Sequence, residues 1–283
     1  MAFDRRTFMD STFRHTAQAV VILIALLVSG CAADPNVPMQ ASAAPFGSQV
    51  TLIYVPGIGG FGHDDRGWLK GLRAAGYEGK VEVWDWNGRM GPIEALWAHD
   101  RQRAEARHIA GRIRQIRADS PAAPIVLVGH SAGTGVVVNG LEDLPPDVRV
   151  DELVLLAPAL SRSYDLTVAL RHVRGRADVF DSDRDTLVLA IGTFLFGTVD
   201  GVHSEAAGHG GFVAPHGADS HAYGRLHMHP YSRDRQRAGD DGGHEGILTP
   251  RVAATVVAPL LNESLPSDGP RRPDGPAIAV VDP

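Results

Sequence analysis

The sequence is short of cysteine and of positive charge, and each shortage excludes a class of protein. Cys31 is the only cysteine among 283 residues, so no intrachain disulfide can form. The 27 Lys and Arg residues are outnumbered by 33 Asp and Glu, which leaves a net charge of -6 and no basic stripe. This balance argues against a nucleic-acid partner. Internal repeats are also absent, while a hydrophobic content of 44% is enough for a sizeable globular core.

The N-terminal segment has the features of an export signal. Paired arginines precede an apolar run over residues 17–28, which is shorter than a typical transmembrane helix. The run ends in Val28-Ser29-Gly30-Cys31, which resembles the bacterial lipobox, whose cysteine is lipidated and becomes the new N-terminus. We therefore expect a signal peptide over 1–30, then a lipidated Cys31 and a flexible Ala-, Pro- and Ser-rich tether over 31–47.

This interpretation places the mature protein in the bacterial cell envelope, anchored to a membrane through its lipid. An ordinary signal peptide cut nearby, or an uncleaved anchor, would account for the same apolar run. The segment Asp4-Arg5-Arg6-Thr7-Phe8-Met9 also resembles a twin-arginine export signal, so the sequence leaves the export route open.

The rest of the chain alternates between short apolar runs and helical patterns. Strands are predicted over residues 50–55, 80–86, 124–129, 152–157, 178–180 and 226–229. Helices are predicted near residues 65–75, 92–118, 134–141, 161–172 and 247–261. This alternation implies crossover connections, so we expect one α/β domain over 48–263 with a mainly parallel sheet and no cap inserted after Ala157. The tail over 264–283 is rich in Pro, Gly and charge and is predicted to be disordered.

The segment Gly129-His130-Ser131-Ala132-Gly133 joins a β-branched strand directly to a helical pattern. In this Gly-x-Ser-x-Gly pattern, a strained strand-to-helix turn exposes the serine hydroxyl at the carboxyl end of a sheet. The glycines are needed because side chains would collide across so tight a turn. The first N–H groups of the following helix favour negative charge beside the hydroxyl.

With this turn, the sequence resembles the α/β-hydrolase family of serine hydrolases. The resemblance implies a single α/β-hydrolase domain with helices on both sides of the sheet. It also implies an esterase- or lipase-like activity on a small-molecule or lipid ester, through an acyl-enzyme on Ser131, without a cofactor or metal. Thioester, amide and acyl-transfer chemistry use the same residues and stay open.

The order nucleophile, acid, histidine in this family selects the partners of Ser131. The base is expected in the loop before the closing helix, where His244 lies. The acid is expected after the strand that ends at residue 180, where Asp181, Asp183 and Asp185 are candidates. Asp185 is preferred because it lies furthest beyond the strand and directly precedes an apolar segment, although Asp183 stays open.

Two backbone N–H groups are expected to face the oxyanion of such a reaction. One belongs to Ala132, which follows the nucleophile. By resemblance, the other belongs to Ile58, in the glycine-rich loop after the first strand. The glycines of this loop allow its backbone to approach a substrate closely.

Three other functions compete with this prediction. Gly57 to Gly62 has the form Gly-x-Gly-x-x-Gly, and Asp85 follows at the end of the next strand, as in dinucleotide-binding proteins. A catalytically silent hydrolase fold used for binding is another alternative. The third is a metal site in the histidine-rich segment, from the candidate ligands His203, His209, His216, His221, Asp200 and Asp219.

Overall fold

The computed structural model describes residues 49–87, 98–185, 198–202, 204–265 and 278–281. All of them belong to one compact unit. The expected signal peptide, the lipidation site at Cys31 and the tether lie outside the described residues. Among the residues that are described, no helix is both long and apolar enough to cross a membrane.

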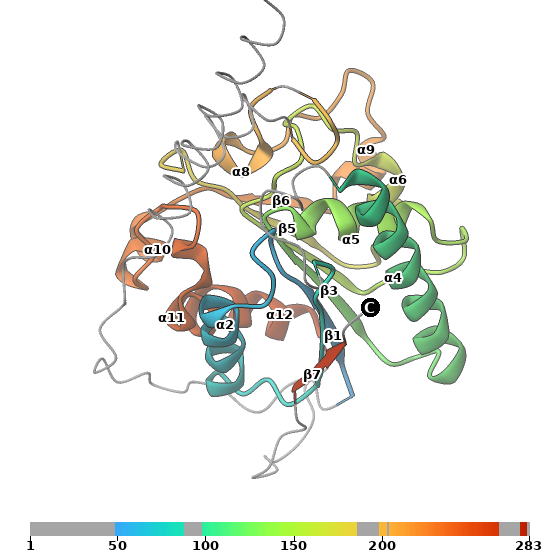
Figure 1. The fold of residues 1–283 in the computed structure, drawn as a ribbon, viewed down its shortest axis with the longest axis horizontal. Coiled ribbons are helices and arrows are strands. Elements are labelled where there is room, and N and C mark those ends of the chain that lie inside the picture. Colours follow the sequence, from blue (N-terminus) through green and yellow to red (C-terminus); the bar gives the residue numbers. More distant parts are fainter. Residues whose placement is uncertain (1–48, 88–97, 186–197, 203, 266–277, 282–283) are drawn as a thin grey trace, which may run out of the picture. The chain divides into compact units, whose positions relative to one another are not determined.

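A seven-stranded sheet lies at the centre of the unit, in the order β6-β5-β4-β3-β1-β2-β7 (Figure 1). Every neighbouring pair of strands is parallel. The strands are β1 Thr51–Val55, β2 Lys80–Trp84, β3 Ile125–His130, β4 Glu152–Leu156, β5 Ala177–Phe180, β6 Leu226–His229 and β7 Ile278–Val281. The chain between β4 and β5 is described throughout and holds no separate cap domain. The predicted α/β fold class, a parallel sheet without a large cap, is confirmed for the described residues.

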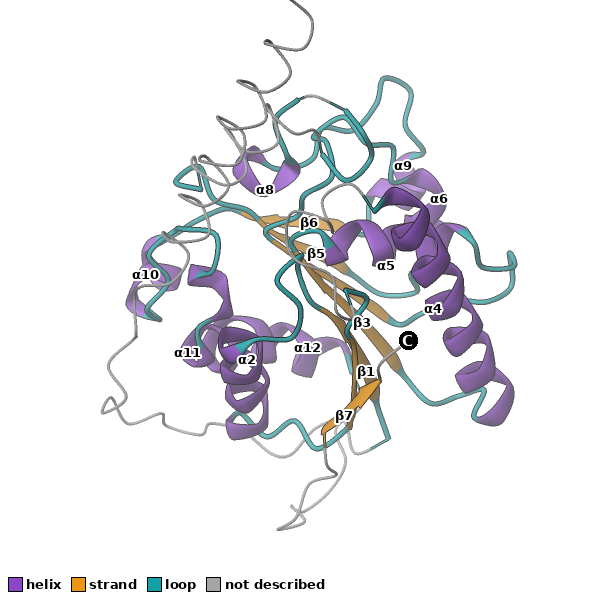
Figure 2. Ribbon diagram, in the orientation of Figure 1, coloured by secondary structure: helices purple, strands orange, loops and turns teal. Residues whose placement is uncertain are grey.

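Helices pack on both faces of this sheet (Figure 2). One face is covered by α4 His99–Asp119, α5 Gly133–Glu142 and α6 Thr167–Arg171. The other is covered by α2 His63–Ala74, α11 Pro250–Val252 and α12 Ala258–Ser264. The shorter elements are α8 Ala207–Gly210, α9 Ser220–Tyr223, α10 Arg233–Arg237, the 3-10 turn η2 Gly246–Leu248 and the π-helical turn η3 Ala253–Val257.

Each central strand contributes to two hydrophobic cores, one on each side of the sheet. In β1, Leu52 and Tyr54 pack with α2 and the closing helices, whereas Ile53 and Val55 pack with α4 and α5. All four side chains are fully buried. Burial on both faces explains why the strand is a continuous apolar run rather than an alternating one. Because β1 pairs with β3, the loops that follow these two strands begin side by side.

Two predicted helices are shorter or more interrupted than expected. The helix predicted over 161–172 is limited to α6, because Ser161 donates from its N–H and its hydroxyl to the Asp200 carboxylate. These bonds tie the segment before α6 to a loop instead of a helix. The closing helix is interrupted before Pro250, which lacks a backbone N–H and begins a new helical segment. The start of the helix predicted over 92–118 lies outside the described residues, and α4 is its described part.

The tail predicted to be disordered contains a strand, so that prediction is wrong for residues 278–281. This segment is β7, which pairs in parallel with β2 from Val81↔Ile278 to Trp84↔Val281. The Pro, Gly and charge content of the tail obscured its short apolar run Ile-Ala-Val-Val. The N–H and C=O groups on the outer side of β2 provide hydrogen-bond partners for this run.

Candidate active site

Ser131 lies on the tight turn between β3 and α5. Its φ of 50° is in the left-handed region, which residues other than glycine rarely adopt. A Cβ atom on Gly133 would lie 2.4 Å from the carbonyl oxygen of Pro56, and one on Gly129 would lie 2.8 Å from the Cα of Thr134. A side chain on Gly129 would collide with the start of α5, and one on Gly133 would collide with the backbone that ends β1. The two glycines therefore allow the close packing that places Ser131 at the carboxyl end of β3.

The structure brings Ser131 together with two other residues that the sequence singled out. The Ser131 hydroxyl and Nε2 of His244 are 2.8 Å apart, and Nδ1 of His244 is 2.7 Å from Oδ2 of Asp185. All three side chains are buried. In the neutral imidazole with its proton on Nδ1, that N–H donates to Asp185 and Nε2 accepts from the serine hydroxyl. The arrangement is therefore a continuous hydrogen-bonded chain from carboxylate to hydroxyl.

The electrostatics of this chain favour a basic imidazole. Burial alone would lower the pKa of His244, but the charge and the hydrogen bond of Asp185 raise this pKa to about 9. A carboxylate so close stabilises the imidazolium form, in which the ring has accepted a proton. The same carboxylate also fixes the tautomer of the ring.

The competing acids of the same loop do not reach His244. Asp183 is exposed. Asp181 is buried, which raises the pKa of its carboxyl group. Its backbone oxygen accepts a hydrogen bond from Arg235, and its carboxylate is not among the partners of His244. Of the three candidates, Asp185 is the one in contact with the imidazole.

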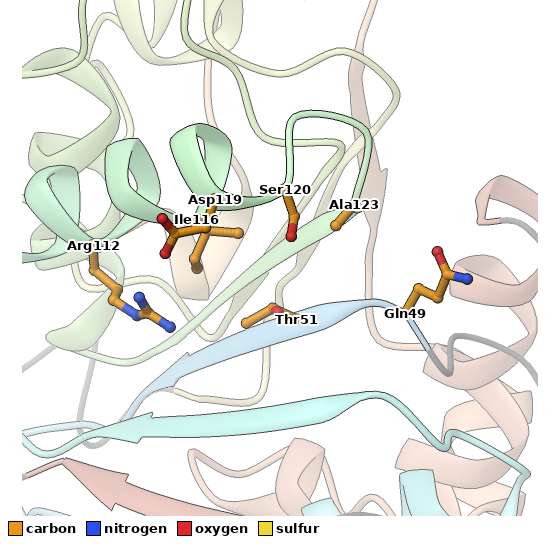
Figure 3. Close-up of a pocket in the computed structure, with 7 residues that line it drawn as sticks. All are labelled: Gln49, Thr51, Arg112, Ile116, Asp119, Ser120 and Ala123. Atoms are coloured by element: carbon orange, nitrogen blue, oxygen red, sulfur yellow. The ribbon is translucent and has the colours of Figure 1, made fainter.

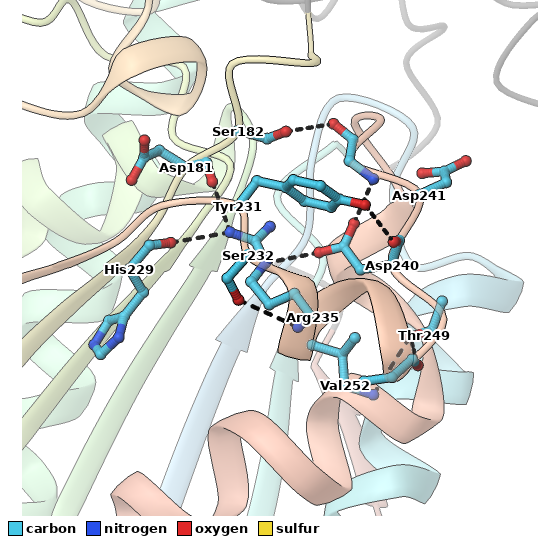
Figure 4. A network of polar contacts seen from close by, with 12 residues as sticks. Asp181, Ser182, His229, Tyr231, Ser232, Arg235, Asp240, Asp241, Thr249 and Val252 are labelled. Carbon is cyan, nitrogen blue, oxygen red and sulfur yellow. Dashed lines mark hydrogen bonds and ion pairs between the residues drawn. The ribbon is translucent and has the colours of Figure 1, made fainter.

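A buried polar network holds the loop that carries His244 (Figure 4). The Arg235 guanidinium binds Oδ2 of Asp240 at 2.7 Å and donates to the carbonyl oxygens of Asp181 and His229 at 2.6 and 2.9 Å. Oδ1 of Asp240 accepts from the N–H of Gly242, two residues before His244. The His244 loop is thus fastened to the ends of β5 and β6.

Ser182 adds a direct link between the loop that carries Asp185 and the loop that carries His244. Its hydroxyl donates to the carbonyl oxygen of Gly242 at 2.6 Å, as the dashed line in Figure 4 shows. No pattern in the sequence pointed to Ser182, Arg235 or Asp240. An arginine five residues before an aspartate is an ordinary surface pattern, so no local signal distinguished this buried pair.

The glycine-rich loop after β1 lies against Ser131. A Cβ atom on Gly57 would lie 3.1 Å from the Cβ of Ser131 and 3.5 Å from its hydroxyl oxygen. The carbonyl oxygen of Gly57 accepts from Nδ2 of Asn87 at 2.7 Å and from the N–H of Gly60 at 3.1 Å. The peptide bonds of the described residues are trans, so the N–H of Ile58 points away from Asn87. Asn87 therefore sets the orientation of the peptide that carries the Ile58 N–H.

Asp85 also fastens this loop, a use that competes with the dinucleotide hypothesis. Its Oδ2 accepts from the N–H of Phe61 at 3.1 Å, and its Oδ1 accepts from the N–H of Asn87 at 3.3 Å. A Cβ atom on Gly60 would lie 3.2 Å from the carboxylate. Both carboxylate oxygens have backbone donors, so Asp85 serves the loop rather than presenting a free acceptor to a ribose.

The described members of the predicted histidine-rich metal site do not gather into one cluster. His209 lies 2.9 Å from Glu205, Asp219 pairs with Arg171 and caps α9, and Asp200 binds Ser161. His203 lies outside the described residues. Among those that are described, the one group of His, Cys, Asp and Glu side chains close enough to share an ion comprises His130, His244 and Glu245.

Two pockets elsewhere in the unit do not include the serine. One, of about 230 Å³, lies between the end of α4 and the start of β1 (Figure 3). Ser131 instead follows the carboxyl end of β3. The other, of about 360 Å³, is lined by His99, Gln102, Arg103, Asn139, Tyr164, Val199, Asp200 and Gly201. Neither has a residue of the hydrogen-bonded chain in its lining.

No protein-family model matches the sequence, and no curated protein matches it. Among solved structures, a predicted CIB-like hydrolase from Thermoplasma acidophilum is 17% identical over 76% of this chain and 87% of its own, with a TM-score of 0.42. A lipase-esterase related protein from Clostridium acetobutylicum is 12% identical over 77% and 95%, with a TM-score of 0.43. The NocB thioesterase domain, bound covalently to a fluorophosphonate nocardicin G analogue, is 15% identical over 76% and 94%, with a TM-score of 0.39. These similarities concern the fold and assign no activity to this chain.

Proposed function

We propose that this protein is a serine hydrolase that cleaves carboxylic esters through an acyl-enzyme intermediate. One observation carries the proposal: a serine on a strained turn shares a hydrogen bond with a histidine whose other nitrogen binds a buried carboxylate. A serine hydroxyl is a weak nucleophile at neutral pH, and an adjacent base oriented by a third group is what activates it. Burial of all three groups supports the same interpretation, because it keeps the geometry fixed.

In the proposed reaction, Ser131 Oγ attacks the acyl carbonyl while Nε2 of His244 accepts the hydroxyl proton. The imidazolium, stabilised by Asp185, then returns the proton to the leaving alkoxide. A water molecule enters, loses its proton to His244 and attacks the acyl-enzyme, which releases the acid and restores the hydroxyl of Ser131. Each proton passes through Nε2 of His244, so the proposed reaction requires no metal or cofactor.

The negative oxygen of the tetrahedral intermediate needs preorganised donors. The N–H of Ala132, at the start of α5, and the N–H of Ile58 are our candidates. Two contacts support Ile58: the close approach of Gly57 to Ser131, and the Asn87 bond that orients the peptide between Gly57 and Ile58. Donors held in place before the reaction lower its barrier because they need no reorganisation as charge develops.

The proposed substrate is a small-molecule or lipid ester. A lipid anchor on Cys31 would hold the site close to membrane acyl chains, in the bacterial cell envelope. Replacing Cys31 by Ser should release the protein from membranes without lowering its esterase activity, measured by fractionation and by ester hydrolysis. Continued membrane association would count against the anchor.

Fluorophosphonate labelling tests the proposed mechanism, since the probe reacts with base-activated serines. We expect the purified wild type to be labelled, and Ser131→Ala and His244→Ala to remain unlabelled. Ser120→Ala is the matched control, because Ser120 is exposed at the end of α4 and should leave labelling unchanged. A folded wild type that resists the probe would instead support a catalytically silent fold.

A further inference from the structure

A buried histidine beside the hydrogen-bonded chain has no role in the proposed reaction. His130 directly precedes Ser131 and is 3% exposed. Its Nε2 is buried and has no hydrogen-bond partner among the described residues. A buried polar atom without a partner costs free energy, so its presence beside the hydrogen-bonded chain calls for an explanation. The ring of His130 lies against that of His244, with the ring centres 5.2 Å apart.

Two further donor atoms lie around this orphaned nitrogen. Oε2 of Glu245 is 3.8 Å from Nε2 of His130, and one ligand atom from each of His130, His244 and Glu245 lies within 4.8 Å of the other two. Donor atoms around a tetrahedral zinc ion are roughly 3.4 Å apart, because the Zn–N and Zn–O bonds are about 2.0–2.2 Å long. The Glu245 side chain is 29% exposed, so it can rotate and bring its carboxylate oxygen into the coordination sphere of a zinc ion held by the two histidines.

We propose that His130, His244 and Glu245 form an inhibitory zinc site over the nucleophile. The metal binds Nε2 of both histidines and a carboxylate oxygen of Glu245. Coordination displaces the Ser131 hydroxyl from the lone pair of His244, so the serine loses its base. The inhibition rests on the proposed function, whereas the binding of the metal does not.

The chemistry of the donors selects the kind of metal. Two imidazoles and a carboxylate suit Zn²⁺, while Mg²⁺ and Ca²⁺ prefer oxygen ligands alone. Asp185 also supports the site, because it accepts a hydrogen bond from Nδ1 of His244 at 2.7 Å. A carboxylate on the far nitrogen of a zinc-binding histidine fixes the ring and increases its affinity for the metal. The residues that prepare His244 as a base thus also prepare it as a ligand.

Zinc affinity, measured on the full chain by competition with a chromogenic chelator, tests the binding directly. We expect Glu245→Gln and His130→Gln each to weaken Zn²⁺ binding by about 10-fold or more, since even the loss of a residue that only supports a ligand costs about 10–100-fold. Ser131→Ala should keep the affinity of the wild type, because its hydroxyl is not a ligand. His63→Gln is the matched control, as the side chain of His63 is 99% exposed elsewhere on the unit. Equal affinity in the wild type and in both ligand variants would overturn the proposal.

The rate of fluorophosphonate labelling tests the inhibition. Zn²⁺ should slow labelling of the wild type at concentrations that match its measured affinity, and Mg²⁺ should not. In Glu245→Gln, with each rate compared with that variant's own zinc-free rate, about 10-fold more Zn²⁺ should be required. Labelling that Zn²⁺ slows equally in both proteins would refute the proposed site. If the wild type is never labelled, the proposed function fails, while the chelator competition still decides whether the metal binds.

Discussion

The substitution Arg235→Met tests whether the buried network in Figure 4 holds the His244 loop. Arg235 and Asp240 are 3% and 1% exposed, and their charged groups are 2.7 Å apart. Methionine keeps much of the apolar volume but leaves the Asp240 carboxylate buried without its cation. It also removes the donor to the carbonyl oxygens of Asp181 and His229.

The expected loss of stability follows from this burial. Breaking a buried ion pair by removing one partner costs about 3–5 kcal/mol, because the other charge is left uncompensated. For a domain of this size, each 1 kcal/mol lowers Tm by roughly 2–4 °C, so we expect a fall of about 10 °C. Urea unfolding at equilibrium and thermal melting would both measure it. Hydrolysis below the melting temperature should also fall, because Asp240 holds Gly242 and thereby positions His244.

Arg237 provides the matched control for this prediction. It pairs with Asp234 in the same short helix, but the two side chains are 74% and 83% exposed. Exposed pairs contribute about 0–1 kcal/mol, so Arg237→Met should barely change the free energy of unfolding. In the double variant Arg235→Met with Asp240→Asn, removal of the stranded charge should recover part of the loss. A cost of less than about 1 kcal/mol for Arg235→Met would refute the role of the network.

Four further predictions concern the site and its surroundings. Asp185→Asn should lower kcat by about 10⁴, the loss expected when a Ser-His-Asp triad loses its acid, whereas Asp183→Asn should have little effect. Because the neutral form of His244 is the base, and its pKa is raised to about 9, kcat/KM should rise with pH up to about that value. Asn87→Ala should lower kcat more than it raises KM, since we propose that the Ile58 N–H oriented by this bond acts in the transition state. Burial raises the pKa of Glu152 to about 7, so the folded state loses stability as pH rises from the ordinary carboxyl pKa through that value. Glu152→Gln should therefore gain stability relative to the wild type over the same range.

Each of these predictions has an outcome that contradicts it. A larger kcat loss in Asp183→Asn than in Asp185→Asn would move the acid to Asp183. A pH profile that levels off below pH 7 would mean that the Asp185 pair does not raise the pKa of the base. An unchanged kcat in Asn87→Ala would remove its positioning role. A difference in Tm between Glu152→Gln and the wild type that is constant from pH 4 to 8 would show that this carboxyl titrates normally.

Local sequence patterns determined the main architecture and the position of the candidate nucleophile. The turn at Ser131 follows a five-residue pattern that can be read directly from Gly129 to Gly133. The atoms that exclude a side chain at Gly133 nevertheless come from the end of β1 and from Pro56. The alternation of apolar runs with helical patterns likewise predicted a parallel sheet. His244 was predicted as the base because it occupies the position along the chain that the histidine has in the α/β-hydrolase family, which the sequence resembles.

Contacts between distant segments decided the rest. Ser131 and His244 are 113 positions apart, and no local pattern in either segment predicts that their side chains are in contact. Asp183 and Asp185 are two residues apart in the same loop, so only the path of the folded chain selects the one that reaches the imidazole.

Other features of the site could be seen only in the fold. The Arg235 network, the Asn87 bond to Gly57 and the pairing of β7 with β2 all join segments that no local pattern relates. Propensity and turn sterics act over a few neighbouring residues, whereas burial, ion pairing and hydrogen bonding depend on which segments the tertiary structure brings together.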